Sequence, residues 1–399
     1  MNLKLNFTLP QNQTGVTQTF ISMLSSGSPF MKQLMGGIQP VNGTYNISAT
    51  LCTPANNTKH STIEILTHGV GFDRYYWDFA PGYSYVDVAT QYNHATFFYD
   101  RLGVGKSSKP DAVSIVQTPL ELEILQSLVT MLKSGNFSNN TFSTIIGTGH
   151  SFGSLLTQGL TAKYPNSLDA AILTGFSTNS TGQQPFITGL NLAIASQNQP
   201  YRFSNLSNGY LVSDTAISNQ IAFLHAQNFD PNILNLAEAT KGPVTFGELF
   251  SQTAVMGTAM NFTGSVAVVN GDNDLPFCAG NCSYPTNLAQ AALQLYPMAR
   301  SIGTYLALHT GHGINLHYSA VAAYHHIQEF IANTPSYQIW FHGPTLVKGT
   351  KLPQPQYNLL QSLKWDTMSV LVEEERFLTD YGTFSSFFIT LAGDPTAIE

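Results

Sequence analysis

Short apolar runs alternate along the chain with longer stretches that have helical periodicity. The runs typical of buried strands are Thr62–Thr67, Ala95–Tyr99, 143–147, Ala170–Thr174, 265–269 and 304–308. Apolar residues three or four positions apart, as in amphipathic helices, mark 119–133, 153–164, 285–295 and 318–332. Strands that alternate with helices predict an α/β fold, in which a mostly parallel sheet is covered by helices on both faces.

The remaining segments divide the chain into five parts. Residues 1–43 form an N-terminal extension with one short helix expected at 17–24. The core begins with an alternating run at 44–51, which predicts a strand at an exposed sheet edge. Apolar and aromatic residues mixed with Asn, Gln and Ser predict a mainly helical cap inserted into the core. We therefore expect core segments at 44–176 and 263–336, the cap at 177–262 and a C-terminal extension at 337–399.

The C-terminal extension has no clear counterpart in the alternating pattern. It contains an acidic stretch at 370–378 that favours a helix, and an apolar run at 384–391. Packing on the core, a homodimer contact and partial disorder are all compatible with this composition. The sequence therefore leaves the oligomeric state open, with a homodimer through residues 337–399 as one prediction.

Composition and charge exclude several classes of protein. Of 399 residues, 43% are hydrophobic, 12% aromatic and only 10% charged, and the net charge is -7. This apolar content excludes a disordered or coiled-coil chain. The chain has no stripe of Lys and Arg that could neutralise phosphates, so we expect no nucleic-acid partner. It also has no run of 18 apolar residues, so we expect no membrane span.

The polar residues include many acceptor sites for N-linked glycans. Eleven Asn-x-Ser/Thr sequons are about twice the number that the residue frequencies give by chance. This excess favours secretion or a location in the lumen of the secretory pathway. The N-terminus lacks the apolar core of a signal peptide, so for a secreted protein we expect a processed chain. The sequons begin at Asn6, Asn12, Asn42, Asn46, Asn56, Asn136, Asn139, Asn179, Asn205, Asn261 and Asn281.

The chain has three cysteines, and two of them could form a disulfide in the oxidising secretory pathway. Cys278 and Cys282 flank Gly280, which permits a tight turn, so we expect a disulfide between them. Free thiols or metal ligands are the alternatives, but the additional ligands of a metal site are not identifiable nearby. Cys52 is interpreted as a buried thiol.

The strongest catalytic signal is Gly149-His150-Ser151-Phe152-Gly153, between a strand and a helix. A serine in such a tight turn has its hydroxyl pushed clear of the backbone, and the flanking glycines let the turn close. A second strand runs into a glycine-rich turn at residues 68–71. Two backbone N–H groups are needed to stabilise an oxyanion, and those of Val70 and Phe152 are the candidates.

A third motif follows the strand at Ala95–Tyr99 and begins at Asp100. The order His-Gly, Asp-Arg-x-Gly-x-Gly-x-Ser-x-x-Pro and Gly-His-Ser-x-Gly resembles the α/β-hydrolase family over residues 44–332. The resemblance implies a central sheet of about eight mostly parallel strands and a Ser–acid–His triad in that chain order.

The resemblance also indicates where the other triad members lie. The Gly-x-x-Asp turn of the family maps onto Gly271 and Asp274, which favours Asp274 over Asp272 as the acid. Among three histidines after the last strand, the flanking glycines favour His312 over His309 and His317. Imidazole suits this role because its pKa of ~6.5 lets it accept and return a proton near neutral pH.

Other residues near these motifs have plainer interpretations. His68 and His150 are interpreted as structural. Arg74 is interpreted as a solvated surface charge, with an ion pair to Asp73 or Asp78, or an anchor for a substrate carboxylate, as the alternatives. The histidines after the last strand lack the His-Glu-x-x-His spacing of zinc proteases, so no metal is expected, and no other cofactor. Aromatic residues close to the oxyanion turn favour an apolar or ring-bearing substrate in a pocket formed by Phe72, Tyr75, Tyr76 and Trp77. The alternative is that these residues pack the first helix onto the sheet.

We therefore expect a serine esterase or lactonase that acts on a small-molecule substrate. Ser151 would be the nucleophile, His312 the general base and Asp274 the acid that orients it. The sequence leaves two alternatives open. One is non-hydrolytic chemistry with the same triad, such as acyl transfer, cyclisation or C–C cleavage, and the other is a non-catalytic binding module on the same fold.

Overall fold

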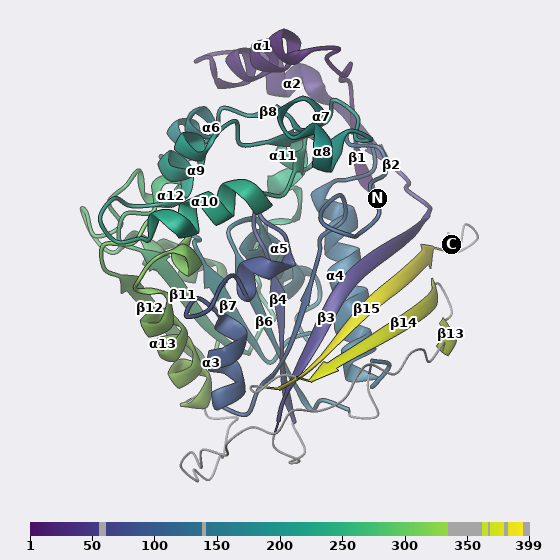
Figure 1. Ribbon diagram of the computed structural model, residues 1–399, viewed down its shortest axis with the longest axis vertical. Coiled ribbons are helices and arrows are strands. Elements are labelled where there is room, and N and C mark those ends of the chain that lie inside the picture. The colour runs from purple at the N-terminus through teal and green to yellow at the C-terminus, as the bar shows by residue number, and fades with distance from the viewer. Residues whose placement is uncertain (56–60, 138–140, 334–360, 366–367, 379–381, 394–399) are drawn as a thin grey trace.

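The fold is built around one long, twisted sheet. The computed structural model describes residues 1–55, 61–137, 141–333, 361–365, 368–378 and 382–393 (Figure 1). Within them the sheet has ten strands in the order β12-β11-β7-β6-β4-β5-β3-β15-β14-β13. The strands are β3 (Thr44–Pro54), β4 (Thr62–Thr67), β5 (Ala95–Tyr99), β6 (Thr144–His150), β7 (Ala170–Thr174), β11 (Ser265–Gly271), β12 (Ser301–Ala307), β13 (Gln361–Trp365), β14 (Met368–Leu378) and β15 (Gly382–Gly393).

The sheet has a parallel part and an antiparallel part. Every neighbouring pair from β5 to β12 is parallel, whereas β3 is antiparallel to both β5 and β15. Parallel strands in the centre of such a sheet are covered on both sides and therefore have continuous apolar sequences. All six residues of β4 are buried, as this rule requires.

Helices cover both faces of the parallel part. Glu64 of β4 accepts hydrogen bonds from Tyr85 of α3 (Tyr85–Gln91) and Gln328 of α13 (Ala320–Ala332) at 2.6 and 2.8 Å. The next residue, Ile65, points to the other face and pairs with Gly147, which lies against Thr157 of α5 (Phe152–Lys163). Helix α4 (Thr118–Lys133) packs beside α5. The expected α/β architecture is therefore confirmed.

The expected strands at β4, β5 and β7 have the predicted bounds, whereas three other predictions are wrong. Residues 285–295 contain only a 3-10 helix, η3 (Leu288–Leu295). β3 is not an edge strand, because β15 pairs along its outer side. The stretch 370–378 belongs to β14 and not to a helix, because β15 offers it a partner at every residue. Tertiary pairing here outweighs the helix preference of its glutamates.

A mainly helical insertion lies above the carboxyl ends of the parallel strands (Figure 1). It occupies the chain between β7 and β11 and also holds a small three-stranded sheet. Its elements are α6 (Gln183–Leu190), β8 (Ala193–Ile194), α7 (Ala195–Asn198), α8 (Pro200–Phe203), β9 (Tyr210–Val212), α9 (Ala216–Phe223), α10 (Pro231–Thr240), β10 (Val244–Thr245), α11 (Phe246–Ser251) and η2 (Gln252–Val255).

The N-terminal segment rests on this cap. It comprises β1 (Asn2–Leu5), α1 (Gln13–Leu24), α2 (Phe30–Leu34) and β2 (Met35–Gln39), so the helix expected at 17–24 begins earlier than predicted. The ring of Phe7 packs on those of Phe246 and Phe250 in α11, with centroids 4.9 and 5.0 Å apart. The segment therefore adds an apolar layer above the insertion, at the top of Figure 1.

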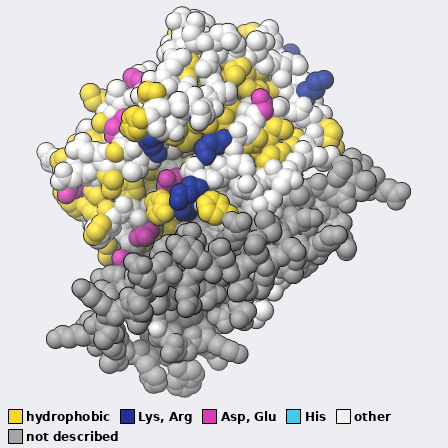
Figure 2. All heavy atoms as spheres, turned by 45° about the vertical axis from the view of Figure 1, so that its right-hand side comes forward, with side chains coloured by type: hydrophobic (Ala, Val, Ile, Leu, Met, Phe, Trp, Pro, Cys, Tyr) yellow, Lys and Arg dark blue, Asp and Glu magenta, His cyan; other side chains and the backbone are white. Residues whose placement is uncertain are grey.

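The surface has few charges, and Figure 2 shows a face on which most described side chains are uncharged. Asn56 and Asn139 lie outside the described residues. None of the other nine sequon asparagines is buried, and only Asn136 and Asn179 are half-buried. Glycosylation itself stays a prediction. Among the described residues, no helix has both the length and the apolar character that a membrane span requires.

Candidate active site

Ser151 occupies the sharp turn between β6 and α5. Its backbone has φ 54° and ψ -113°, a region that residues other than glycine rarely adopt. A hydrogen bond from its N–H to the carbonyl of Thr174, 2.9 Å long, helps to hold the turn. A side chain at Gly149 would collide with the backbone of Gly153, and one at Gly153 with that of Thr67. Both glycines of the sequence motif are therefore required by close backbone packing.

The structure brings Ser151, His312 and Asp274 into one chain of hydrogen bonds. His312 Nδ1 lies 2.6 Å from Asp274 Oδ2, and His312 Nε2 lies 2.8 Å from Ser151 Oγ. The other carboxylate oxygen of Asp274 accepts a hydrogen bond from the N–H of Phe277 at 2.9 Å. A carboxylate can only accept here, so His312 carries its proton on Nδ1 and presents the Nε2 lone pair to the serine hydroxyl.

The alternative acid lies close by but faces another group. Asp272 Oδ1 accepts a hydrogen bond from the N–H of Thr310 at 3.0 Å and another from the side chain of Asn273. Gly271 leaves no room for a side chain against the backbone of Thr310 and Gly311. Asp272 therefore ties the loop that carries Asp274 to the loop that carries His312.

The two neighbouring histidines have different surroundings. His309 is exposed in a turn with φ 55°, whereas His317 is buried. His317 Nδ1 donates to the carbonyl of Gly313 at 2.8 Å, and its Nε2 accepts from the N–H groups of Gly311 and His225 at 3.1 and 3.0 Å. Burial lowers the pKa of His317 to about 4, so the ring is neutral near pH 7. His317 therefore forms hydrogen bonds with the residues on both sides of His312, Gly311 and Gly313.

The glycine-rich turn at residues 68–71 packs directly against Ser151. A side chain at Gly69 would lie 3.0 Å from Ser151 Cβ, which shows how closely the two backbones approach. Within the part of the chain that the structure describes, the N–H groups of Val70 and Phe152 donate no hydrogen bond. Two unengaged N–H groups beside a serine hydroxyl are what an oxyanion site needs.

His68 and His150 beside these motifs are buried. His68 Nε2 accepts a hydrogen bond from the N–H of Arg101 at 3.1 Å, and His150 Nδ1 lies 3.1 Å from the hydroxyl of Thr174. Burial lowers the pKa of both histidines well below the ordinary value. The neutral ring of His68 links the glycine-rich turn to the motif that begins at Asp100, and that of His150 links the serine turn to β7. Both contacts agree with the structural role expected for these histidines.

Two arginines of the motifs are buried in ion pairs, which the sequence pattern missed. Arg74 is not a solvated charge, because its guanidinium contacts the Asp100 carboxylate at 2.6 Å and is only 2% exposed. Arg101 pairs with Glu121 of α4 at 2.7 Å and with Glu248 of α11 in the cap. Its guanidinium also lies 4.4 Å above the ring of Phe152. Arg101 therefore joins the core, the cap and helix α5.

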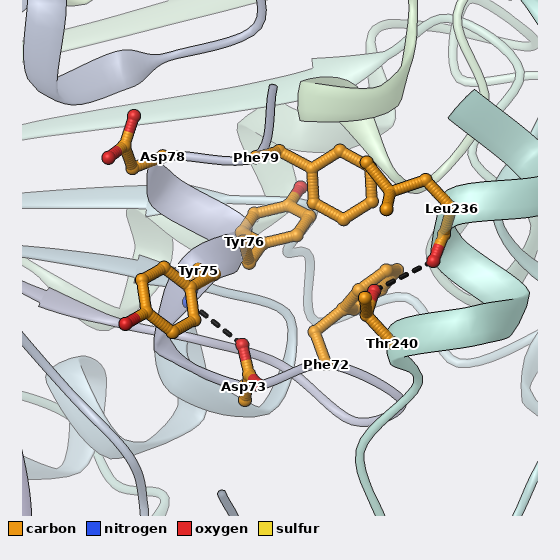
Figure 3. A pocket seen from close by; sticks show the side chains of 8 residues that line it. All are labelled: Phe72, Asp73, Tyr75, Tyr76, Asp78, Phe79, Leu236 and Thr240. Atoms are coloured by element: carbon orange, nitrogen blue, oxygen red, sulfur yellow. Dashed lines mark hydrogen bonds between the residues drawn. The ribbon is translucent and has the colours of Figure 1, made fainter. Parts of the chain in front are cut away.

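Three of the four aromatic residues predicted to form a substrate pocket line one cavity. Phe72, Tyr75 and Tyr76 line a cavity of about 210 Å³ between the cap and the turn η1 (Arg74–Trp77), shown in Figure 3. Trp77 does not line this cavity, because it is fully buried between Tyr76 and Tyr85, with ring centroids 5.4 and 5.2 Å away. A buried aromatic residue in a turn can serve a pocket or a core, and its sequence does not distinguish the two.

Phenylalanine rings from three elements surround the imidazole of His312. Phe186 of α6, Phe223 of α9 and Phe277 of α12 (Leu275–Cys278) have centroids 5.5, 6.1 and 5.8 Å from it. His312 itself is only 1% exposed. The catalytic base candidate therefore lies in an apolar environment to which the cap contributes two rings.

Gly175 is a site residue that the sequence analysis missed. It follows β7 with φ +54°, and a side chain there would lie 2.8 Å from His150 Cε1 and 2.9 Å from His312 Cε1. Glycine here combines a positive φ with the space that both imidazoles need. Nothing in the local sequence marks it, since the two histidines reach it from other segments.

We expect Gly175→Ala to lower kcat by about 100-fold, because a shift of His312 by a fraction of an ångström spoils its alignment with Ser151. The matched control is Gly82→Ala, since Gly82 also has a positive φ, +81°, but open space around it. Steady-state kinetics of both variants would check this. Equal losses of kcat would mean that backbone strain, and not crowding of the imidazole, is responsible.

The expected disulfide joins Cys278 to Cys282. The N–H of Cys282 donates to the carbonyl of Asp272, and that of Gly280 to the carbonyl of Asp274, at 2.8 and 2.9 Å. The bridge closes residues 278–282, and the two hydrogen bonds tie this closed loop to the segment that carries Asp274. Cys52 is a free, buried thiol. Among the described residues, no group of three or more His, Cys, Asp or Glu side chains could hold a metal ion.

Comparisons with known proteins identify the fold but give little on function. No protein-family model and no curated protein matches the chain. A monoacylglycerol lipase from Paleococcus ferrophilus superposes with a TM-score of 0.50 at 13% identity, covering 71% of this chain and 97% of the lipase. For a highly thermostable carboxyl esterase from Bacillus coagulans the TM-score is 0.50 at 17% identity, with 74% and 96% covered. Identities this low show a common fold alone.

Proposed function

Because the chain has the α/β-hydrolase fold, we propose that it is a serine hydrolase that cleaves a carboxylic ester or lactone through an acyl-enzyme. One observation carries the proposal. Ser151 Oγ, His312 and Asp274 are joined by hydrogen bonds of 2.8 and 2.6 Å in a buried setting. The fold alone would not suffice, since it serves many unrelated functions.

In the first half of the reaction, Ser151 Oγ attacks the carbonyl carbon while His312 Nε2 takes its proton. The negative charge that develops on the carbonyl oxygen is stabilised by the N–H groups of Val70 and Phe152. Asp274 holds the imidazole in the required tautomer and stabilises its positive charge. The ester C–O bond then breaks, and His312 returns the proton to the departing alcohol oxygen.

Water completes the cycle by the same route. It attacks the acyl-enzyme, gives its proton to His312 Nε2, and releases the carboxylic acid as Ser151 regains its hydrogen. No cofactor enters these steps. The phenylalanine rings around His312 favour a small, largely apolar acyl group, because such a group replaces water there without leaving polar atoms unpaired.

Labelling with a fluorophosphonate probe tests the proposal. An activated serine forms a covalent adduct with the probe, so we expect one modification that maps to Ser151 by mass spectrometry. Labelling should disappear in Ser151→Ala, whose unfolding curve should match that of the unmodified chain. A panel of short-chain, long-chain and lactone substrates would then define the acyl preference.

The contrary outcome is also clear. Folded protein that remains unlabelled and turns over none of these esters would refute a serine hydrolase. Labelling at another serine would keep the reaction class but reject the assignment of Ser151.

A further inference from the structure

The cavity in Figure 3 has an aromatic wall that the proposed reaction does not use. The ring of Phe72 contacts those of Tyr76 and Phe79, with centroids 4.9 and 6.5 Å away. Tyr75 adds a fourth, half-exposed ring. These four residues come from the turn after β4, and Leu236 and Thr240 of the cap helix α10 line the opposite side.

The size of the cavity limits what it can hold. Its volume is about 210 Å³. A dry, apolar cavity of about 150 Å³ in another protein holds one benzene molecule. The present cavity therefore has room for one six-membered aromatic ring with a short substituent.

The charged lining is acidic. Asp73 and Asp78 are the lining residues that carry formal charge. In Figure 3, Asp73 lies beside Phe72 and Tyr75, whereas the carboxylate of Asp78 points away from the rings. Asp73 also accepts a hydrogen bond from the N–H of Tyr75 at 2.9 Å. A carboxylate-bearing ligand would meet like charge here, whereas a cation would gain both Coulomb attraction and contact with ring faces.

The two arginines whose charges lower the pKa of Asp73 already have other polar partners. Arg74 pairs with Asp100 at 2.6 Å, and its guanidinium lies 4.7 Å from the centroid of the Tyr75 ring. Arg202 of α8 donates to Gln199 and to the carbonyl of Lys241, both at 2.8 Å. Neither arginine lines the cavity, so the acidic side chains determine the charge that a ligand meets first.

We propose that this cavity binds a single aromatic ring carrying an uncharged or positively charged substituent and rejects the matching carboxylate. The ring can belong to the ester substrate or to a separate small molecule. The position of the cavity allows the ring to belong to the ester substrate. Tyr76 stacks on His150 and Phe72 contacts Phe223, with ring centroids 4.5 and 4.9 Å apart. The rings of His150 and Phe223 both contact that of His312. A ring that belongs to the ester substrate rests on the proposed function, whereas the charge preference of the cavity does not.

Three probes of similar size test the charge preference: benzylamine as its ammonium ion, benzyl alcohol and benzoate. In ligand-observed NMR titrations of the Ser151→Ala protein at pH 7.5, we expect benzylammonium to bind at least about tenfold more tightly than benzoate, with benzyl alcohol between them. This measurement needs no turnover, so it stands even if no ester is hydrolysed.

Lower pH should reduce this preference. Burial, and then the charge of Asp100, raises the pKa of Asp73 to about 6, while the N–H of Tyr75, Arg74 and Arg202 act in the opposite direction. Asp73 is therefore ionised at pH 7.5 and protonated at pH 5. Both charged probes keep their charge over this interval, so the ratio of their affinities should fall.

Variants locate the binding within the cavity. Thr240 is exposed at the rim, so Thr240→Trp should fill the space and abolish binding of all three probes, while Thr240→Ser should not. Asp73→Asn should keep the helix cap, because asparagine caps as well as aspartate, and should reduce only the charge preference. Asp214→Asn changes a carboxylate that lines a different cavity and serves as the control.

The source of the ring follows from kinetics. Competition by benzylammonium with ester turnover, raising KM at constant kcat, would assign the cavity to the substrate, and a change in kcat alone would assign it to a separate ligand. Equal affinity for benzoate and benzylammonium, unchanged binding in Thr240→Trp, or no binding of any probe would overturn the proposal.

Discussion

Asp274→Asn is expected to lower kcat by about 10³ to 10⁴-fold while the protein stays folded. An amide in place of the carboxylate favours the wrong tautomer of His312, and substitutions of this kind in serine proteases have effects of about that size. Asparagine can still accept the hydrogen bond from Phe277 that caps α12, so the loss of stability should stay below about 1 kcal/mol. Steady-state kinetics and denaturant unfolding of the same preparation would check both parts.

Asp272→Asn is the matched control, two residues away in the same loop. Its amide oxygen can still accept from the N–H of Thr310, so we expect kcat to change by less than about threefold. A larger loss in this variant than in Asp274→Asn would exchange the roles of the two aspartates.

The second large effect is expected for stability. Arg101→Met removes the buried cation that faces both Glu121 and Glu248. Breaking one side of a buried ion pair leaves an uncompensated charge, so we expect the free energy of unfolding to fall by about 3 to 5 kcal/mol. Urea unfolding at pH 7.5 would measure the change. Activity should fall as well, because the guanidinium packs on the ring of Phe152 beside the oxyanion turn.

A double substitution tests the reason for this loss. Changing Glu121 and Glu248 to glutamine in the Arg101→Met background should restore part of the stability, since no net charge then remains buried. Burial raises the pKa of Glu121 well above its ordinary value, so lowering the pH should also reduce the penalty. Lys163→Met, which breaks an exposed ion pair with Glu123, is the control with a small expected effect.

The sequence predicted the parts of the fold that depend on local pattern. The apolar runs at β4, β5 and β7 are buried on both faces, so their bounds follow from hydrophobicity alone. Tight turns are equally local, and for that reason the position of Ser151 between a strand and a helix could be expected from its glycines. The order of three such turns along the chain then indicated the fold.

What the sequence could not predict depends on partners distant along the chain. Residues 370–378 form a strand because β15 lies beside them, and Arg74 is buried because Asp100 faces it. Gly175 and His317 support His312 through contacts that span other loops, and no short motif records such contacts. The size of the aromatic cavity likewise depends on α10, which contributes Leu236 and Thr240 from the cap.

The contacts between the cap and the loop of His312 have an evolutionary consequence. The N–H of Gly313 donates to the carbonyl of Phe223 at 2.7 Å, and the N–H of His225 donates to the imidazole of His317 at 3.0 Å. On the other side of the site, the N–H of Gly242 donates to the carbonyl of Gly71 in the oxyanion turn at 3.0 Å. The cap is therefore no interchangeable module. A lineage that replaced it to accept new substrates would have to rebuild, in the same step, the supports of the His312 loop and of the turn at residues 68–71.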